Sequence, residues 1–129
     1  MNDIEFIAQN NFEKALLVIE KSNVRQAWES IGAEVHQVGS MAMGLLMKHR
    51  DIDFHIYTDE LNVSESFKVI QKLCANPSVT RMEYRNLADT AEACLEFHIW
   101  FMLENEEWQL DMIQILKGSQ FDGFFENVA

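Results

Sequence analysis

The chain has 129 residues, 48% of them hydrophobic, which suits one globular domain that buries its core without disulfides or structural metals. Its 21 acidic and 10 basic residues give a formal net charge of -11. That charge repels phosphate backbones and so disfavours nucleic acid as a partner. It attracts cations, from metal ions to a polyamine-like substrate, or it serves only as an acidic surface.

Patterns for secretion and membrane insertion are not found in the sequence. No basic region followed by an apolar run opens the chain, and no stretch approaches the roughly 18 apolar residues of a membrane helix. Cys74 and Cys94 have neither zinc-site nor disulfide-framework spacing, so we expect two buried thiols. The sequence predicts a cytoplasmic protein that does not contact a membrane.

The first third of the chain has a helical pattern that gives way to a strand. Apolar residues recur at helical spacing across 3–31, and Ser22 is the expected cap of a second helix. Gly32 suits the position just past a helix end. Residues 35–38 then alternate as a short strand that runs into a tight turn at 39–40.

The rest of the chain predicts a strand, a helix and three further strands. A strand at 52–57 is followed by a helix that begins at Asn62, with Glu65 completing a pattern like a capping box, and that ends before Pro77. The last three strands are expected at 79–84, 95–103 and 108–116.

This order of elements predicts an α+β fold, a mixed sheet with helices packed on it. With no repeat or linker composition, we expect one domain over 1–129, made of a helical part (1–32), a sheet (33–116) and a tail (117–129).

The last two strands are expected to pair as an antiparallel hairpin. With Asn105 and Glu106 as the turn, Trp100 would stand opposite Asp111. One face of the hairpin then carries the polar candidates Glu96, His98, Trp100 and Asp111.

The second predicted strand carries two acids. Asp51, Asp53 and His55 project to one side because side chains alternate along a strand, and the apolar residues between them project to the other. Two carboxylates at this spacing are close enough to share metal ions, and they repel one another without a cation. A solvated strand edge is the alternative reading of these acids taken alone.

The context of the acids is more specific. Gly39-Ser40 precedes Asp51-Ile52-Asp53 by ten residues, and Leu110-Asp111-Met112 places a lone acid in a later apolar strand. This pattern resembles the nucleotidyltransferase superfamily that includes DNA polymerase beta. The resemblance covers about residues 35–116 and implies the nucleotidyltransferase fold.

Two segments resemble particular branches of that superfamily. Residues 39–44 look like the turn of the minimal nucleotidyltransferases, and residues 48–53 are similar to antibiotic nucleotidyltransferases that act on aminoglycosides and lincosamides. The chain departs from the first group at Met41 and Met43, where arginines are frequent. It also ends soon after the third acid, whereas many relatives continue into a helical domain.

The resemblance implies a division of roles. Gly39 and Ser40 would bind nucleotide phosphates, Gly39 because the backbone can approach closely and Ser40 through its hydroxyl and amide. Asp51 and Asp53 would hold two Mg²⁺ ions with a nucleoside triphosphate as co-substrate. Asp111 would complete the metal on the hydroxyl side and assist removal of the proton.

Further residues are candidates with a structural alternative. Lys48 and Arg50 would neutralise phosphate charge, or belong to a solvated loop. His55, His98 and Trp100 are candidate acceptor contacts, or fill the polar face of the sheet.

Three functions compete. The leading hypothesis is transfer of a nucleoside monophosphate to a hydroxyl of a small-molecule acceptor, such as an aminoglycoside- or lincosamide-like antibiotic. The alternative is a non-catalytic or partner-dependent binding module, like the minimal relatives with antitoxin roles. A nucleic-acid polymerase is disfavoured by the net charge.

The acceptor site is expected to be incomplete within this chain. Residues after 116 are too few for a helical acceptor domain, so a second subunit, a helical partner or a further segment would complete it. Phe121, Phe124 and Phe125 would pack across a homodimer partner, or fold back on the chain's own helices.

Overall fold

The computed structural model describes residues 3–39 and 49–118, and it confirms the predicted α+β order of elements. The elements are α1 (Asp3–Ser22), α2 (Val24–Glu29), β1 (Glu34–Val38), β2 (Asp51–Thr58), α4 (Val63–Cys74), β3 (Val79–Leu87), β4 (Cys94–Leu103) and β5 (Glu106–Leu116).

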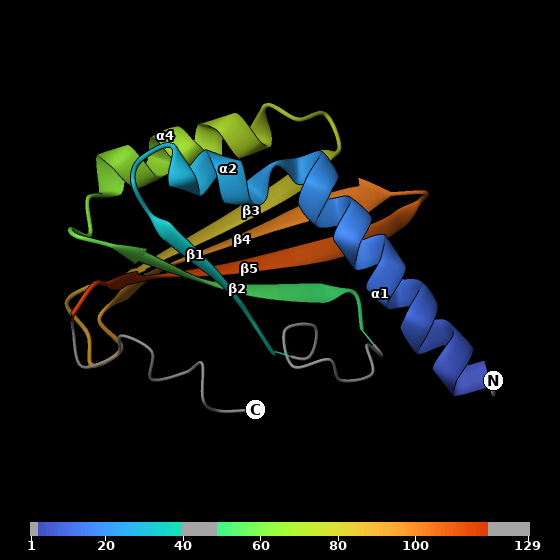
Figure 1. Ribbon diagram of the computed structural model, residues 1–129. Helices are drawn as coiled ribbons and strands as arrows, with labels where there is room; N and C mark the ends of the chain where they lie inside the picture. The colour runs from blue at the N-terminus through green and yellow to red at the C-terminus, as the bar shows by residue number, and fades with distance from the viewer. Residues whose placement is uncertain (1–2, 40–48, 119–129) are drawn as a thin grey trace.

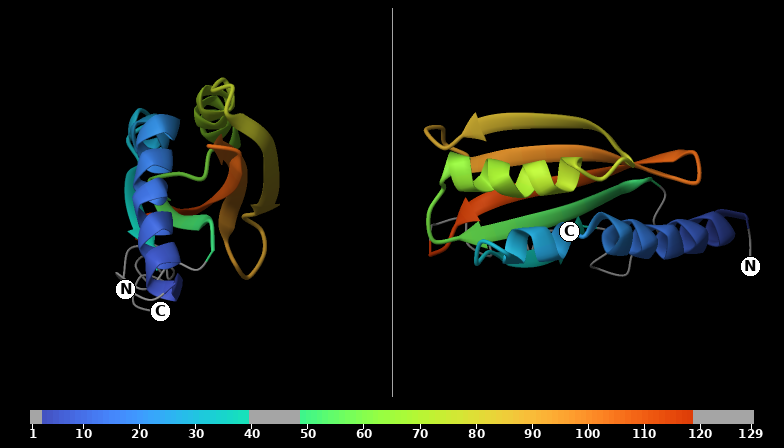
Figure 2. Two further views of the ribbon diagram at one scale, coloured as in Figure 1. Left: turned by 90° about the vertical axis from the view of Figure 1, so that its right-hand side faces the viewer. Right: turned by 90° about the horizontal axis from the view of Figure 1, so that it is seen from above.

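The five strands form one mixed sheet in the order β1-β2-β5-β4-β3. β2 and β5 run parallel in its centre, and every other neighbouring pair is antiparallel. The helices α1, α2 and α4 lie together on one side of the sheet, which curves around them (Figures 1 and 2). None of these three helices lies on the opposite face, so the two faces of the sheet have different surroundings.

The core lies between the sheet and the helices. Alternate residues of the central strands face the helices and are buried, among them Phe54 of β2, Phe97 of β4 and Leu110 of β5. Trp28 of α2 packs against Phe97, with ring centroids 5.8 Å apart. Each fully buried side chain of this size contributes about 1.5–3 kcal/mol, so the helix-facing side of the sheet supplies most of the stability.

Local sequence signals explain where the helices begin and end. The Asn62 side chain accepts a hydrogen bond from the Glu65 backbone N–H at 3.0 Å, as the capping pattern predicts. Gly32 has φ +84° just after α2, the left-handed conformation expected past a helix end. The cap of α2 is one residue later than predicted, at Asn23, and the Ser22 hydroxyl instead accepts from the Val24 N–H at 3.3 Å.

The predicted hairpin turn is wrong by one position. The loop is Glu104-Asn105, with φ of 51° and 66°, and β4 pairs with β5 so that His98 rather than Trp100 stands opposite Asp111. Two successive left-handed residues form the turn whose twist matches a two-residue hairpin, and Asn tolerates that conformation well. The partner shifts by two residues, so each side chain keeps the face that was predicted for it.

Two features of the helices depart from simple expectation. Cys74, at the end of α4, is exposed, so only Cys94 is the buried thiol that was predicted. The N-terminal half of α1 extends away from the sheet (Figure 1), and Ile4, Ile7 and Leu16 are at least half exposed despite their helical spacing. In the described part of the chain, no helix combines the length and apolar character needed to cross a membrane.

Candidate active site

Asp53 and Asp111 face each other across the two central strands. The parallel register pairs Asp53 of β2 directly with Asp111 of β5, and Asp51 with Gln109 two residues earlier. Since Phe54 and Leu110 are buried under the helices, the alternation of side chains places the acids on the opposite face. Two acids that are 58 positions apart in the sequence therefore meet in the middle of the sheet.

The acids leave an excess of negative charge at this point. Burial raises the pKa of Asp53 to about 7, helped by the charge of Asp111, a hydrogen-bond contact with Asp111 and the charge of Asp51. Within residues 3–39 and 49–118, the causes of this pKa shift are burial and neighbouring carboxylates, and none of them is a positive charge. The site is therefore suited to a cation supplied from outside the chain.

Gly39 brings the backbone at the end of β1 against this cluster. Its φ is +78°, and a Cβ built on it would lie 2.6 Å from Asp53 Oδ2, closer than real Cβ contacts allow. Any side chain at position 39 would displace the Asp53 carboxylate. Gly39 of the sequence motif is thus packed directly against Asp53.

Asp111 is held from its other side by residues of β4 and β5. Gln109 Nε2 donates a hydrogen bond to Asp111 Oδ1 at 2.7 Å, and His98 Nδ1 lies 3.4 Å from the same oxygen. His98 Nε2 is 2.9 Å from Glu96 Oε1. Gln109 was not among the predicted site residues: its spacing from Asp111 places both side chains on one face of β5, but no charge or motif marks it.

Five of the predicted site residues line one cavity of about 320 Å³, whose walls are Val38, Gly39, Asp53, Phe54, His55, His98, Asp111 and Ile113. A neighbouring cavity of about 450 Å³ shares His55 and Ile113 with it and is completed by Ala91, Glu92, Cys94, Glu96 and Ile115. Both cavities open on the acid-bearing face, and the second is mainly apolar with two carboxylates.

Other predicted residues lie outside this cavity or outside the described chain. The Arg50 side chain turns to the β4–β5 hairpin, where Nε donates to the Glu107 carbonyl at 3.2 Å. The Trp100 ring, buried on the acid-bearing face, is covered by the Arg81 guanidinium 3.8 Å from its centroid. Asp51 is exposed at the start of β2. Ser40 and Lys48 lie outside the described residues.

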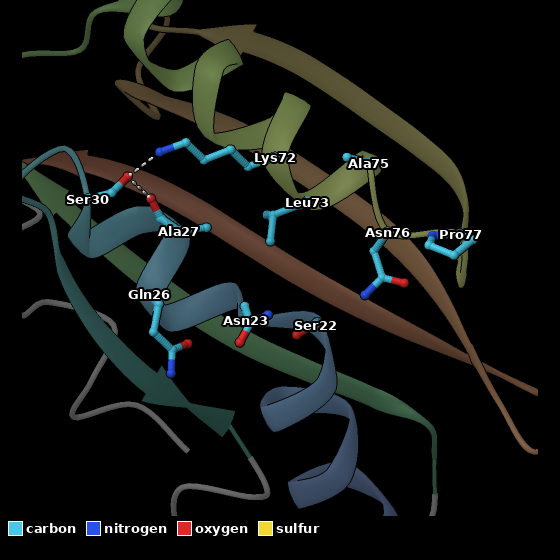
Figure 3. A pocket seen from close by; sticks show the side chains of 10 residues that line it. All are labelled: Ser22, Asn23, Gln26, Ala27, Ser30, Lys72, Leu73, Ala75, Asn76 and Pro77. Carbon is cyan, nitrogen blue, oxygen red and sulfur yellow. Dashed lines mark hydrogen bonds between the residues drawn. The ribbon is translucent and has the colours of Figure 1, made fainter.

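A further cavity of about 590 Å³ lies between α2 and α4, on the helix side of the sheet. Figure 3 shows Lys72 reaching toward Ser30, where Nζ donates to the hydroxyl at 3.1 Å. None of the predicted site residues lines this cavity, so the sheet separates it from the acids.

The acids fit a magnesium ion that is shared with a substrate. Within residues 3–39 and 49–118, no three His, Cys, Asp or Glu side chains are arranged to hold a metal ion on their own. Mg²⁺ bound with a nucleotide commonly takes one or two protein carboxylates and fills its octahedron with phosphate oxygens and water. The adjacent Asp53 and Asp111 supply that donor set.

The described fold matches solved nucleotidyltransferase structures. The Cid1 poly(U) polymerase, solved with MgGTP bound, superposes with a TM-score of 0.63 and 17% identity over 84% of this chain. A cytoplasmic RNA terminal U-transferase gives 0.58 and 18% over 84%, and the GLD-2 poly(A) polymerase in complex with GLD-3 gives 0.56 and 13% over 88%.

This chain spans 33%, 31% and 40% of those three proteins, respectively. Neither a protein-family model nor a curated protein matches the sequence. The likeness establishes the fold of the nucleotidyltransferase superfamily, as the motif resemblance implied.

Proposed function

We propose that this chain is the catalytic domain of a metal-dependent nucleotidyltransferase, which transfers a nucleoside monophosphate from a triphosphate to a hydroxyl of a small-molecule acceptor. The observation that carries the proposal is the contact of Gly39, Asp53 and Asp111 on one face of the sheet. Both the turn and the paired acids are needed for this chemistry, and a structural role explains neither the close approach nor the uncompensated charge.

Each residue has a role in the proposed reaction. Asp51, Asp53 and Asp111 would hold two Mg²⁺ ions, which when bound neutralise phosphate charge and stabilise the attacking and leaving oxygens. Gly39 would let the backbone approach the β- and γ-phosphates, and Ser40 would bind them through its hydroxyl and amide. The acceptor oxygen bonds to the α-phosphorus, the bond to the pyrophosphate oxygen breaks, and the hydroxyl proton passes to Asp111 and then to solvent.

The acceptor is proposed to be small and cationic. The cavity beside the acids has a volume of about 450 Å³, within the range of small-molecule sites, and Glu92 and Glu96 lie in its wall. The names of the structural neighbours give RNA as their substrate, but a net charge of -11 disfavours a long polyanion here. His55 and His98 would contact the acceptor, since both line the cavity that holds Asp53 and Asp111.

The test is pyrophosphate release with each of the four NTPs and Mg²⁺, in the presence of amine-bearing small hydroxyl compounds or of short RNA. We expect release that depends on Mg²⁺ and on a small acceptor and that is lost in Asp53→Asn. Extension of RNA without any reaction on small acceptors would contradict the acceptor class. Nucleotide binding with no release under any condition would contradict catalysis.

The second candidate is a partner-dependent module. It is favoured by one observation: α2 and α4 lie on the side of the sheet away from the acids, and the N-terminal half of α1 extends away from the sheet (Figures 1 and 2). A second subunit or a further segment would then cover the acid-bearing face and complete the acceptor site. Light scattering combined with the release assay decides between them, because a strict monomer that turns over at an ordinary rate needs no such partner.

A further inference from the structure

The Gln109 amide lies beside the Asp111 carboxylate and the His98 ring. Its Nε2 donates to Asp111 Oδ1 at 2.7 Å and lies 3.5 Å from His98 Nδ1. An ionised carboxylate can only accept hydrogen bonds, so the amide N–H is the donor in the shorter contact. The geometry gives Gln109 a place in the site that its sequence position alone did not reveal.

The His98 ring lies between two carboxylates. Its Nε2 is 2.9 Å from Glu96 Oε1, and its Nδ1 is 3.4 Å from Asp111 Oδ1. Glu96 Oε2 is in turn 3.9 Å from a guanidinium nitrogen of Arg85 on β3. The chain of contacts therefore runs from β3 across β4 to Gln109 on β5, and it is anchored on three strands.

We propose that Gln109 is a positioning residue that fixes the rotation of the Asp111 carboxylate toward the metal and the acceptor hydroxyl. This inference rests on the proposed function for its consequence, although the positioning itself is a property of the chain. The charges of Asp53 and Asp51 repel Asp111, and the Gln109 amide holds its Oδ1 from the side of β4. A carboxylate whose Oδ1 is held cannot turn, so the direction of Oδ2 is set as well.

The same strand offers a matched control. Gln114 faces the helix side of β5, is buried, and donates from Nε2 to the Thr58 hydroxyl at 3.0 Å, while the Ser66 hydroxyl donates to its Oε1 at 2.6 Å. Methionine at either position keeps most of the side-chain volume and removes the amide. If Gln109 only packs against its neighbours, methionine should have the same effect at positions 109 and 114. If Gln109 positions Asp111, only Gln109→Met should move the Asp111 carboxylate.

Two measurements on the full chain test the proposal. Crystal structures of the wild type and Gln109→Met show whether Asp111 has rotated away from Asp53. Electron paramagnetic resonance then gives the Mn²⁺ affinity in the presence of a non-hydrolysable triphosphate. We expect Asp111 to turn in the variant and the affinity to fall about 10- to 100-fold, as for other residues that orient metal ligands. Gln114→Met should lower the melting temperature and leave the affinity unchanged.

The outcomes separate this inference from the proposed function. An unmoved Asp111, or unchanged Mn²⁺ affinity in Gln109→Met, overturns the positioning role. A wild type that binds no Mn²⁺ overturns the proposed function, while the crystal structures still decide whether Gln109 orients Asp111. Gln109→Ala is measured alongside, so that poor folding of the methionine variant does not decide the result.

Discussion

The two faces of β5 show how one strand serves both stability and chemistry. On the helix side, Leu110, Met112 and Gln114 are buried, and the Gln114 amide is hydrogen-bonded to hydroxyls on β2 and α4. On the other side, Asp111 shares a crowded site with a second carboxylate. The first face is a packed apolar core in which the buried Gln114 amide is paired, although the buried Trp108 Nε1 has no hydrogen-bond partner among the described residues. The second keeps repelling charges together, as functional sites commonly do.

The largest effect is expected from removing a charge on the acid-bearing face. Asp53→Asn should reduce nucleotide transfer at least about 10³-fold, because electrostatic stabilisation of the transferring phosphate is lost while the fold is kept. Pyrophosphate release measures the change. Asp59→Asn, which removes a carboxylate from the exposed residue just after β2, is the control and should retain activity. Equal activity in the two variants would remove Asp53 from the mechanism.

Gly32 is a matched control for Gly39, because both glycines have a left-handed φ and only Gly39 lies on the acid-bearing face. Gly39 and Gly32 have φ of +78° and +84°, but a Cβ at Gly39 meets Asp53 Oδ2 at 2.6 Å whereas a Cβ at Gly32 meets nothing within 4 Å. Gly32→Ala should cost about 1 kcal/mol of backbone strain. Gly39→Ala should cost the same backbone strain. It should also displace the Asp53 carboxylate, and this displacement should lower nucleotide transfer about 100-fold.

Urea unfolding and pyrophosphate release on both glycine variants provide the measurement. The difference between them isolates the contact with Asp53, since the strain is common to both. Wild-type transfer in Gly39→Ala would show that the close approach of the backbone has no catalytic importance.

A smaller effect is expected on the helix side of β5. Gln114→Leu would leave buried hydroxyls of Ser66 and Thr58 without this partner, at a cost of about 1–3 kcal/mol in the free energy of unfolding. Nucleotide and Mn²⁺ affinity should stay at the wild-type value, because the change is on the face away from the acids. Altered metal affinity in this variant would show that the two faces are coupled through the strand.

Periodicity was enough to predict most of the fold. The alternation in β2 separates Asp51 and Asp53 from the buried Ile52 and Phe54, and this holds wherever the strand lies in the sheet. The hairpin register was not predictable in the same way, because Asn105 fits either of two adjacent turns. Only the left-handed pair Glu104-Asn105 matches the twist of the strands, and that is a property of three-dimensional pairing.

The site was predictable to the extent that it follows the motif. The parallel pairing of β2 with β5 is a long-range contact that no local pattern specifies, and the resemblance to nucleotidyltransferases implied only that Asp111 joins Asp51 and Asp53 in one metal site. The Arg50 side chain points to the β4–β5 hairpin because its Nε donates to the Glu107 carbonyl, and the spacing of residues in the sequence does not place Glu107 beside Arg50. Gln109 carries no charge and belongs to no motif, so its contact with Asp111 emerged only from the packed strands.

The smallest expected effect concerns the pH dependence of stability without metal. The pKa of Asp53 is raised to about 7 in the folded chain, chiefly by burial, against about 3.9 for an unfolded aspartate. A folded state that binds the proton more tightly gains stability from it below about pH 4 and loses that gain as the pH rises through 7. Asp53→Asn, which cannot ionise, should therefore be more stable than the wild type at pH 8 but not at pH 4. After allowance for solvent screening, the gap should be on the order of 1–2 kcal/mol.

Urea unfolding at both pH values in EDTA measures that gap, with Asp59→Asn as the control for a change in net charge. Saturating Mg²⁺ with a triphosphate should close or reverse the stability gap at pH 8. A cation bound at the carboxylates relieves their repulsion in the wild type, and a ligand that binds only the native state adds to its stability. A gap that is the same at both pH values would mean that burial and the neighbouring carboxylates do not raise the pKa of Asp53. The contrast between the two faces of the sheet would then not rest on electrostatics.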